Sequence, residues 1–263
     1  MIDTAVVLAR GLGTRMRSEG GAPLSAAQAG AAAAGHKALM PIGGHRLIDY
    51  SLSALADAGI RRAVVVVAPE HDDFLAHREA LAPSRLTIDF AVQDEPLGTA
   101  HALAAARDAV GGAPFLMVNG DNIYPVDGLV ALGEHGGDAL LGFRRGPLVE
   151  RSNIPAERVD AFALLREEGG ILTDIVEKPA PGTVATAGPD ALVSMNCFAF
   201  TERVFEACAR TPRSVRGEHE IVDAVRLLDD VAVIPFSGGV VDLSRRDDIA
   251  EVERIVADRV VRL

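Results

Sequence analysis

Four short apolar runs rich in β-branched residues alternate with segments of helical periodicity in the first half of this chain. The expected strands cover residues 4–9, 62–68, 86–92 and 114–119, and the expected helices cover residues 46–58, 70–80 and 99–109. Strands that are apolar on both faces and separated by helices are typical of a mainly parallel sheet with helices on both sides. The sequence therefore predicts an α/β fold.

The second half of the chain is less regular and predicts some antiparallel pairing. An EEGG turn separates two strand-like runs, residues 160–165 and 171–176, which favours a hairpin. Further strands are expected at residues 192–200, 231–236 and 240–243, and further helices near 202–210, 219–228 and from 246 onward. Residues 144–159 are interpreted as a polar excursion or flap, and the Ala- and Gly-rich residues 18–35 as a mobile loop. No stretch is typical of a linker, so residues 1–263 are expected to form a single domain.

The charge and the cysteine content argue against several classes of protein. The chain has 263 residues and a net charge of −11, with acids and bases interspersed, so it lacks the basic face that nucleic-acid binding needs. No apolar run approaches the length of a membrane span. Neither a nucleic acid nor a membrane is therefore expected as a partner. Cys197 and Cys208 show no metal-ligand spacing and are interpreted as free thiols of a cytoplasmic protein.

Only two of the 26 basic residues are lysines, and both lie in motifs suited to phosphate binding. Lys37 lies in GHKALMPIGG, and Lys178 lies in VEKP after a strand-like run. The lysine ammonium is a compact charge on a flexible stem, able to follow a phosphoryl group as it moves. The two lysines and their surroundings indicate phosphoryl or nucleotidyl chemistry.

A glycine-containing loop, LARGLGTRMR, follows the first expected strand. Gly11 and Gly13 allow backbone N–H groups to approach an anion, and Arg15 adds charge. The loop does not fit the Rossmann fingerprint, because Met16 stands where a third glycine is required, and it lacks the Gly-Lys-Ser/Thr end of a P-loop. By itself the glycine pair is equally compatible with a tight turn between a strand and a helix.

Several motifs in a fixed order carry a resemblance to a known family. They are GLGTRM, the lysine segment KALMPIG, QDEPLGTAHAL, VNGDNIY, VEKP, the late-strand Asn196, GEHEIVDAV and VVDL. In this order the chain resembles the sugar-1-phosphate nucleotidylyltransferases, the pyrophosphorylases that make nucleotide sugars. The resemblance implies a Rossmann-like three-layer sandwich with a mixed, mainly parallel sheet, as in nucleotide-diphospho-sugar transferases and GT-A-like proteins. It also implies a nucleotide-binding half, about residues 1–125, and a sugar-phosphate-binding half, about residues 126–263.

The resemblance implies transfer of a nucleotidyl group from an NTP to a sugar-1-phosphate, with release of pyrophosphate. Positions matching the family's nucleotide site are Leu8, Ala9, Gly11, Gly13, Thr14, Arg15, Lys37, Gln93, Gly98, Thr99 and Asp121. Positions matching its sugar-phosphate site are Gly120, Glu177, Lys178 and Asn196. Within these sets, the expected catalytic residues are Arg15, Lys37, Asp121 and Lys178, and the expected Mg²⁺ ligands are Asp121 and Asp242.

Each of these positions also has a purely structural interpretation. Asp121 lies in NGDN, a sequence that favours turns. Glu177 and Lys178 are compatible with a solvated pair before a proline, and Asp242 with a helix N-cap. Asn196 is compatible with a hydrogen bond to a buried backbone group.

The chain also departs from the family pattern. Arg10 replaces a glycine usual before the loop, residues 18–36 form a longer connection, and LSRRDD follows Asp242 where the family shows a glycine–threonine turn. These differences indicate a divergent member with an unusual sugar-like acceptor. Two alternatives remain open: a GT-A-type glycosyltransferase that uses an NDP-sugar, and a non-catalytic regulator that binds a nucleotide sugar. Members of the family are often oligomers, so a homo-oligomer is among the expectations.

Overall fold

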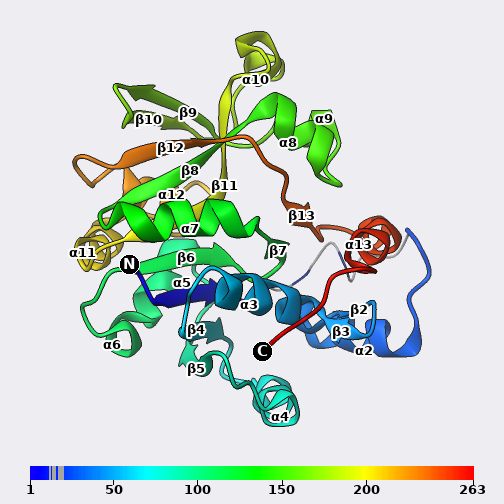
Figure 1. Ribbon diagram of the computed structural model, residues 1–263. Coiled ribbons are helices and arrows are strands. Elements are labelled where there is room, and N and C mark those ends of the chain that lie inside the picture. Colours follow the sequence, from blue (N-terminus) through cyan, green and yellow to red (C-terminus); the bar gives the residue numbers. More distant parts are fainter. Residues whose placement is uncertain (12, 14–15, 17–20) are drawn as a thin grey trace.

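A mixed nine-stranded sheet runs through the computed structural model, which describes residues 1–11, 13, 16 and 21–263 (Figure 1). The strand order is β5-β4-β1-β6-β11-β8-β12-β10-β9. The first four strands in this order are parallel to one another: β5 (Thr87–Val92), β4 (Arg62–Val67), β1 (Thr4–Leu8) and β6 (Phe115–Asn119). The parallel sheet predicted for the first half of the chain is therefore confirmed.

The other half of the sheet contains the antiparallel pairs. Its strands are β11 (Leu192–Phe200), β8 (Ala139–Arg144), β12 (Ala232–Phe236), β10 (Ile171–Val176) and β9 (Leu164–Glu168). β11 and β10 run against the other strands, whereas β8 and β12 are parallel to each other. This mixed, mainly parallel sheet confirms the predicted fold class.

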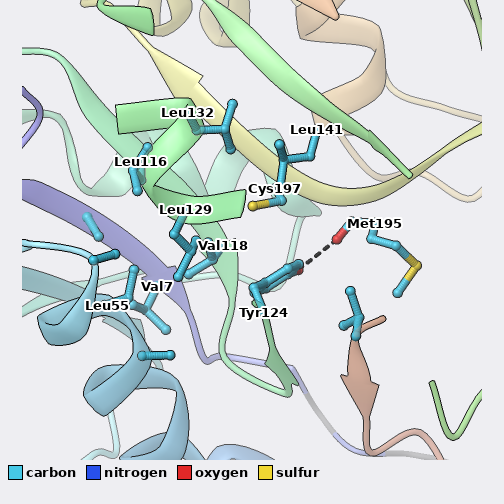
Figure 2. Close-up of a cluster of buried hydrophobic side chains, with 14 of the residues drawn as sticks. Val7, Leu55, Leu116, Val118, Tyr124, Leu129, Leu132, Leu141, Met195 and Cys197 are labelled. Carbon is cyan, nitrogen blue, oxygen red and sulfur yellow. Dashed lines mark hydrogen bonds between the residues drawn. The ribbon is translucent and has the colours of Figure 1, made fainter. Parts of the chain in front are cut away.

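Two layers of helices cover the sheet, and alternate strand residues face each layer. The helices of one face include α3 (Leu47–Asp57), α7 (Val126–His135), α8 (Arg145–Arg151) and α9 (Ala156–Val159). The helices of the other face include α5 (Thr99–Ala105), α6 (Arg107–Val110), α11 (Arg203–Arg210) and α12 (Ile221–Val225). Val7 packs in the first cluster and its neighbour Val6 in the second, as the alternation of a strand requires. Figure 2 shows part of the first cluster, where the buried Tyr124 hydroxyl donates a 2.6 Å hydrogen bond to the Met195 carbonyl.

A third apolar cluster joins the two ends of the chain. It contains Met40, Tyr50 and Val252. Its residues come from or lie beside α2 (Ala26–Ala34), β2 (Pro41–Ile42), α3, β7 (Asn122–Ile123), β13 (Val241–Asp242) and α13 (Ile249–Val256). The short elements η1 (Lys37–Leu39), β3 (His45–Arg46) and η2 (Arg246–Asp248) adjoin them in the chain. In Figure 1 the red α13 lies beside the blue N-terminal elements. The helices α2 and α3 pack against η1, which carries Lys37.

The structure corrects several element predictions. The expected loop 18–35 contains α2, because alanine is the strongest helix former and Ser25 and Gln28 form a capping box; residues 18–20 lie outside the described residues. The expected flap 144–159 contains α8 and α9, and the helix expected at 99–109 is divided into α5 and α6 at Ala106. The helix α4 (Asp72–Leu81) confirms the one expected near 70–80. The elements that were not predicted include α7, β8 and the short α10 (Thr183–Ala187).

Among the described residues, no helix is both long enough and apolar enough to cross a lipid bilayer.

Candidate active site

A pocket of about 480 Å³ lies where the parallel strands β1, β5 and β6 end. In parallel α/β sheets, ligands bind in the crevice beyond the carboxyl ends of the strands. The pocket brings together most of the residues expected from the sequence: Leu8, Ala9, Gly11, Gly13, Lys37, Gln93, Gly98, Thr99, Gly120, Asp121 and Asn196. Two expected residues, Thr14 and Arg15, lie outside the described residues.

Lys37 and Asp121 form an ion pair in the wall of this pocket. Lys37 Nζ donates a hydrogen bond of 2.6 Å to Asp121 Oδ2, and the two side chains are 12% and 34% exposed. Asp121 stands directly before β7, in the turn that follows β6, and Lys37 begins η1. A cation and a carboxylate are therefore held together at the edge of the sheet where the parallel strands end.

Two glycines are required by close backbone contacts in the same pocket. Gly120 donates its N–H to the Leu8 carbonyl at 2.8 Å, and a Cβ at this position would lie 3.0 Å from that oxygen. Gly98 has φ of +102°, and a Cβ there would lie 2.5 Å from the His219 carbonyl oxygen. Both glycines allow strand ends and loops to pack closely enough to shape the pocket.

Gln93 and Thr99 hold the wall of the pocket together. Gln93 is buried, and its amide nitrogen donates to the Gly98 carbonyl at 3.1 Å and lies 3.0 Å from Nδ1 of His101. The Thr99 hydroxyl accepts a 2.8 Å hydrogen bond from the backbone N–H of Ile221. These two side chains fix the loop against which a ligand would pack.

Two of the expected sugar-side residues have left-handed backbone conformations. Asn196 has φ of 55° and Lys178 has φ of 47°, a region that non-glycine residues visit rarely and that is enriched at functional sites. Asn196 lies where β11 shifts its register against β8 between Ser194 and Phe198. This irregularity places Asn196 in the pocket lining.

Glu177 and Lys178 do not line the pocket. Both are exposed and follow the end of β10. Partial loss of hydration raises the pKa of Glu177, and Glu220 raises it further. The 216–220 loop therefore lies near Glu177, and the same loop contributes Glu218 to the pocket. In this conformation the pair lies outside the pocket lining.

Asp242 is buried behind Asp121 and is already well hydrogen-bonded. The antiparallel pair β7–β13 places it opposite Asn122, whose Nδ2 donates to Asp242 Oδ1 at 2.9 Å. Its other oxygen accepts from Arg158 Nη2 at 3.0 Å and from the Ser244 hydroxyl at 2.7 Å. Burial raises the pKa of Asp242, and the charge of Asp121 raises it further. The two carboxylates are thus close enough to repel each other.

The described residues contain no cluster of three or more His, Cys, Asp or Glu side chains suited to a metal ion. Asp121 still offers a donor, because its Oδ1 atom accepts no hydrogen bond within the described part of the chain.

Sequence reasoning assigned no role to several residues that the structure places at the site. Arg10, Asn119 and Glu218 line the pocket. Each lies within or beside a recognised motif, so a motif read as a continuous segment would have included them. The contact of Arg158 with Asp242 joins residues 84 positions apart and leaves no local signal.

Comparison with known proteins identifies nucleotidyl transferases, both by a family model and by individual relatives. The family model described as Nucleotidyl transferase matches residues 4–233. A glucose-1-phosphate thymidylyltransferase of Streptomyces griseus is 31% identical over 97% of this chain. The UTP–glucose-1-phosphate uridylyltransferase AglF of Haloferax volcanii is 27% identical over 95% of this chain. The chain spans 66% of the length of the Streptomyces protein and 95% of the length of AglF.

The fold also matches that of solved structures. UDP-glucose pyrophosphorylase in complex with UDP-glucose superposes with a TM-score of 0.74 at 18% identity, covering 99% of this chain and 100% of that chain. At 18% identity this superposition shows a shared fold and nothing about substrates.

Proposed function

This chain belongs to the nucleotidyl transferase family, and from this premise we propose that it transfers a nucleotidyl group from an NTP to a sugar-1-phosphate or a closely related phosphate. The products are an NDP-sugar and pyrophosphate. The observation that carries the proposal is the ion pair of Lys37 with Asp121 in a pocket at the ends of parallel strands.

The reaction needs two polyanions in one place. An oxygen of the sugar phosphate attacks the α-phosphorus in line, and the bond from that phosphorus to the pyrophosphate oxygen breaks. Catalysis then consists mainly of positioning and of neutralising charge. In the proposed arrangement the Lys37 ammonium contacts the α-phosphate, while Gln93 and Gly98 face the base. The loop that contains Thr14 and Arg15 holds the triphosphate, as the resemblance implies.

We propose Mg²⁺ as the metal, with Asp121 and Asp242 as its protein ligands. The donor set fits, because the charge of Asp121 raises the pKa of the Asp242 carboxyl, and a divalent cation between these two hard carboxylates would relieve their repulsion. When bound, the metal would supply charge neutralisation for the phosphate oxygens. Arg158 now occupies one oxygen of Asp242, so this carboxylate would have to share or exchange that contact.

We assign the sugar phosphate to the side of the pocket formed by Gly120 and Asn196. Asn196 lines the pocket, and its amide can bond to a sugar hydroxyl. Glu177 and Lys178 lie outside the pocket in this conformation. In the proposal they join the sugar-phosphate side after a movement of the loop at residues 216–220 brings them to the pocket.

A screen of NTPs against sugar phosphates that follows pyrophosphate release tests the proposal. A glycosyltransferase would release no pyrophosphate and would consume an NDP-sugar instead. The VNGDN segment offers one carboxylate at the metal position rather than the pair of an Asp-x-Asp motif, which disfavours that alternative. A non-catalytic regulator would bind an NDP-sugar and turn over neither substrate pair.

A further inference from the structure

Arg10 enters the same pocket from the end of β1, at the position where the family pattern described above has glycine. It lines the pocket together with Gln93, Pro96 and Gly98. Its Nη2 atom donates a hydrogen bond of 2.9 Å to the Asp94 carbonyl oxygen. The guanidinium is therefore anchored on the segment that follows β5.

The remainder of this guanidinium lacks hydrogen-bond acceptors. Its Nε and Nη1 atoms are buried and have no partner within the described part of the chain. A buried donor without an acceptor is costly, and such groups are rare in native proteins unless a ligand or water completes them. Arg10 therefore lines the pocket with a guanidinium whose Nε and Nη1 donors have no acceptor among the described residues, and an acceptor supplied by a ligand would relieve the cost of their burial.

The surrounding charge indicates what kind of acceptor this is. Burial lowers the pKa of Arg10, whereas the nearby carboxylates of Glu70, Asp94 and Glu95 raise it. These three carboxylates offset the charge of the guanidinium, so this side of the pocket offers a phosphate group little net attraction. A neutral acceptor, such as the carbonyl oxygen of a base, does not depend on that attraction.

Resting on the proposed function, we infer that Arg10 is a specificity-determining residue that donates hydrogen bonds to a carbonyl oxygen of the nucleobase. Arginine has donors only. Uracil, thymine and guanine present a carbonyl oxygen where cytosine and adenine present an amino group, which is also a donor. Arg10 therefore selects oxo bases and rejects amino bases.

Calorimetric binding of two matched nucleotide pairs, UTP with CTP and GTP with ATP, tests this inference. The wild-type protein binds the oxo member of at least one pair about tenfold or more tightly than its amino partner. In Arg10→Ala the two members of that pair bind within about twofold of each other. Arg10→Gln, which keeps a polar side chain with both a donor and an acceptor, also accepts the amino member. Arg254→Ala removes an arginine that is 71% exposed on α13 and keeps the wild-type ratio.

The results separate this inference from the proposed function. A wild-type protein without discrimination, or an unchanged ratio in both well-folded Arg10 variants, overturns the role of Arg10. If the ratio changes as expected but no sugar phosphate supports pyrophosphate release, the inference stands and the proposed transfer fails. If the wild-type protein binds none of the four nucleotides, both fail. Melting temperatures of the variants identify any loss that reflects unfolding.

Discussion

The Lys37 ammonium lies 2.6 Å from the carboxylate of Asp121, although 84 positions of sequence separate the two residues. Lys37 reaches this point because α2 and α3 pack against η1, and Asp121 because β6 ends beside β1. Each of the two charges has the other as its partner. A bound triphosphate would offer Lys37 a stronger anion and would leave Asp121 available to a cation.

Asp121→Asn tests the carboxylate of this pair. We expect pyrophosphate release to fall by about a hundredfold or more, because the amide keeps the shape but not the negative charge that a metal ion requires. The melting temperature stays close to that of the wild type, since the side chain is 34% exposed. The control is Asp127→Asn, which removes an exposed carboxylate on α7. Turnover at the wild-type rate in Asp121→Asn would exclude Asp121 as a metal ligand.

Lys37→Arg tests whether charge alone is sufficient. Lys37 is only 12% exposed, and the planar guanidinium fork needs more room than the ammonium. We expect Lys37→Arg to lose activity nearly as far as Lys37→Met, by roughly a hundredfold in kcat/KM. Recovery of most of the wild-type kcat/KM by arginine would show that the site needs only a positive charge.

Lys178→Ala tests the sugar-phosphate side. We expect the KM for the sugar phosphate to rise by roughly tenfold, the equivalent of one charge-assisted hydrogen bond, while the KM for the NTP stays within about twofold. Arg166→Ala, which removes another exposed cation from the neighbouring strand β9, leaves both KM values unchanged. Equal effects on both substrates, or no effect on either, would reject the assignment of Lys178 to the sugar phosphate.

The sequence predicts the parts of this fold that depend on local patterns. The apolar runs that became β1, β4, β5 and β6 identify the parallel half of the sheet, and the motifs at their ends identify the pocket. The Ala-rich segment that forms α2 was expected to be a loop because of its low complexity. The helix propensity of alanine outweighs that signal.

Contacts between distant segments account for most of what the sequence does not predict. Asp242 reaches the site through the pairing of β13 with β7, and its partner Arg158 comes from α9. Neither contact has a local signal. The exposed position of Lys178 depends on where the hairpin β9–β10 lies relative to the pocket, which motif order does not determine.

Both cysteines are predicted to be unreactive in the folded protein. Cys197 and Cys208 are free and buried, and burial raises the pKa of the Cys208 thiol to about 12. Because a raised pKa keeps the thiol protonated, little thiolate forms at pH 8. Labelling with a thiol reagent at that pH should therefore be slow in the native protein and rapid in urea. Fast labelling of either cysteine without unfolding would contradict its burial.

Gly98→Ala separates the cost of backbone conformation from the cost of a clash. The matched control is Gly188→Ala at the C-terminal end of α10, where φ is 91° and ψ is −175°, close to the 102° and 179° of Gly98, and where a Cβ would meet nothing within 4 Å. The control bears only the conformational penalty, so we expect its free energy of unfolding to fall by about 2 kcal/mol. At Gly98 the added Cβ also meets the His219 carbonyl, which accepts the N–H of Ala100. Overpacking adds to the conformational penalty, so we expect the free energy of unfolding in urea to fall by roughly 3 kcal/mol. We also expect nucleotide binding to weaken. Equal losses in the two variants would mean that the contact between residues 98 and 219 yields without cost, so that Gly98 would not be needed to shape the pocket.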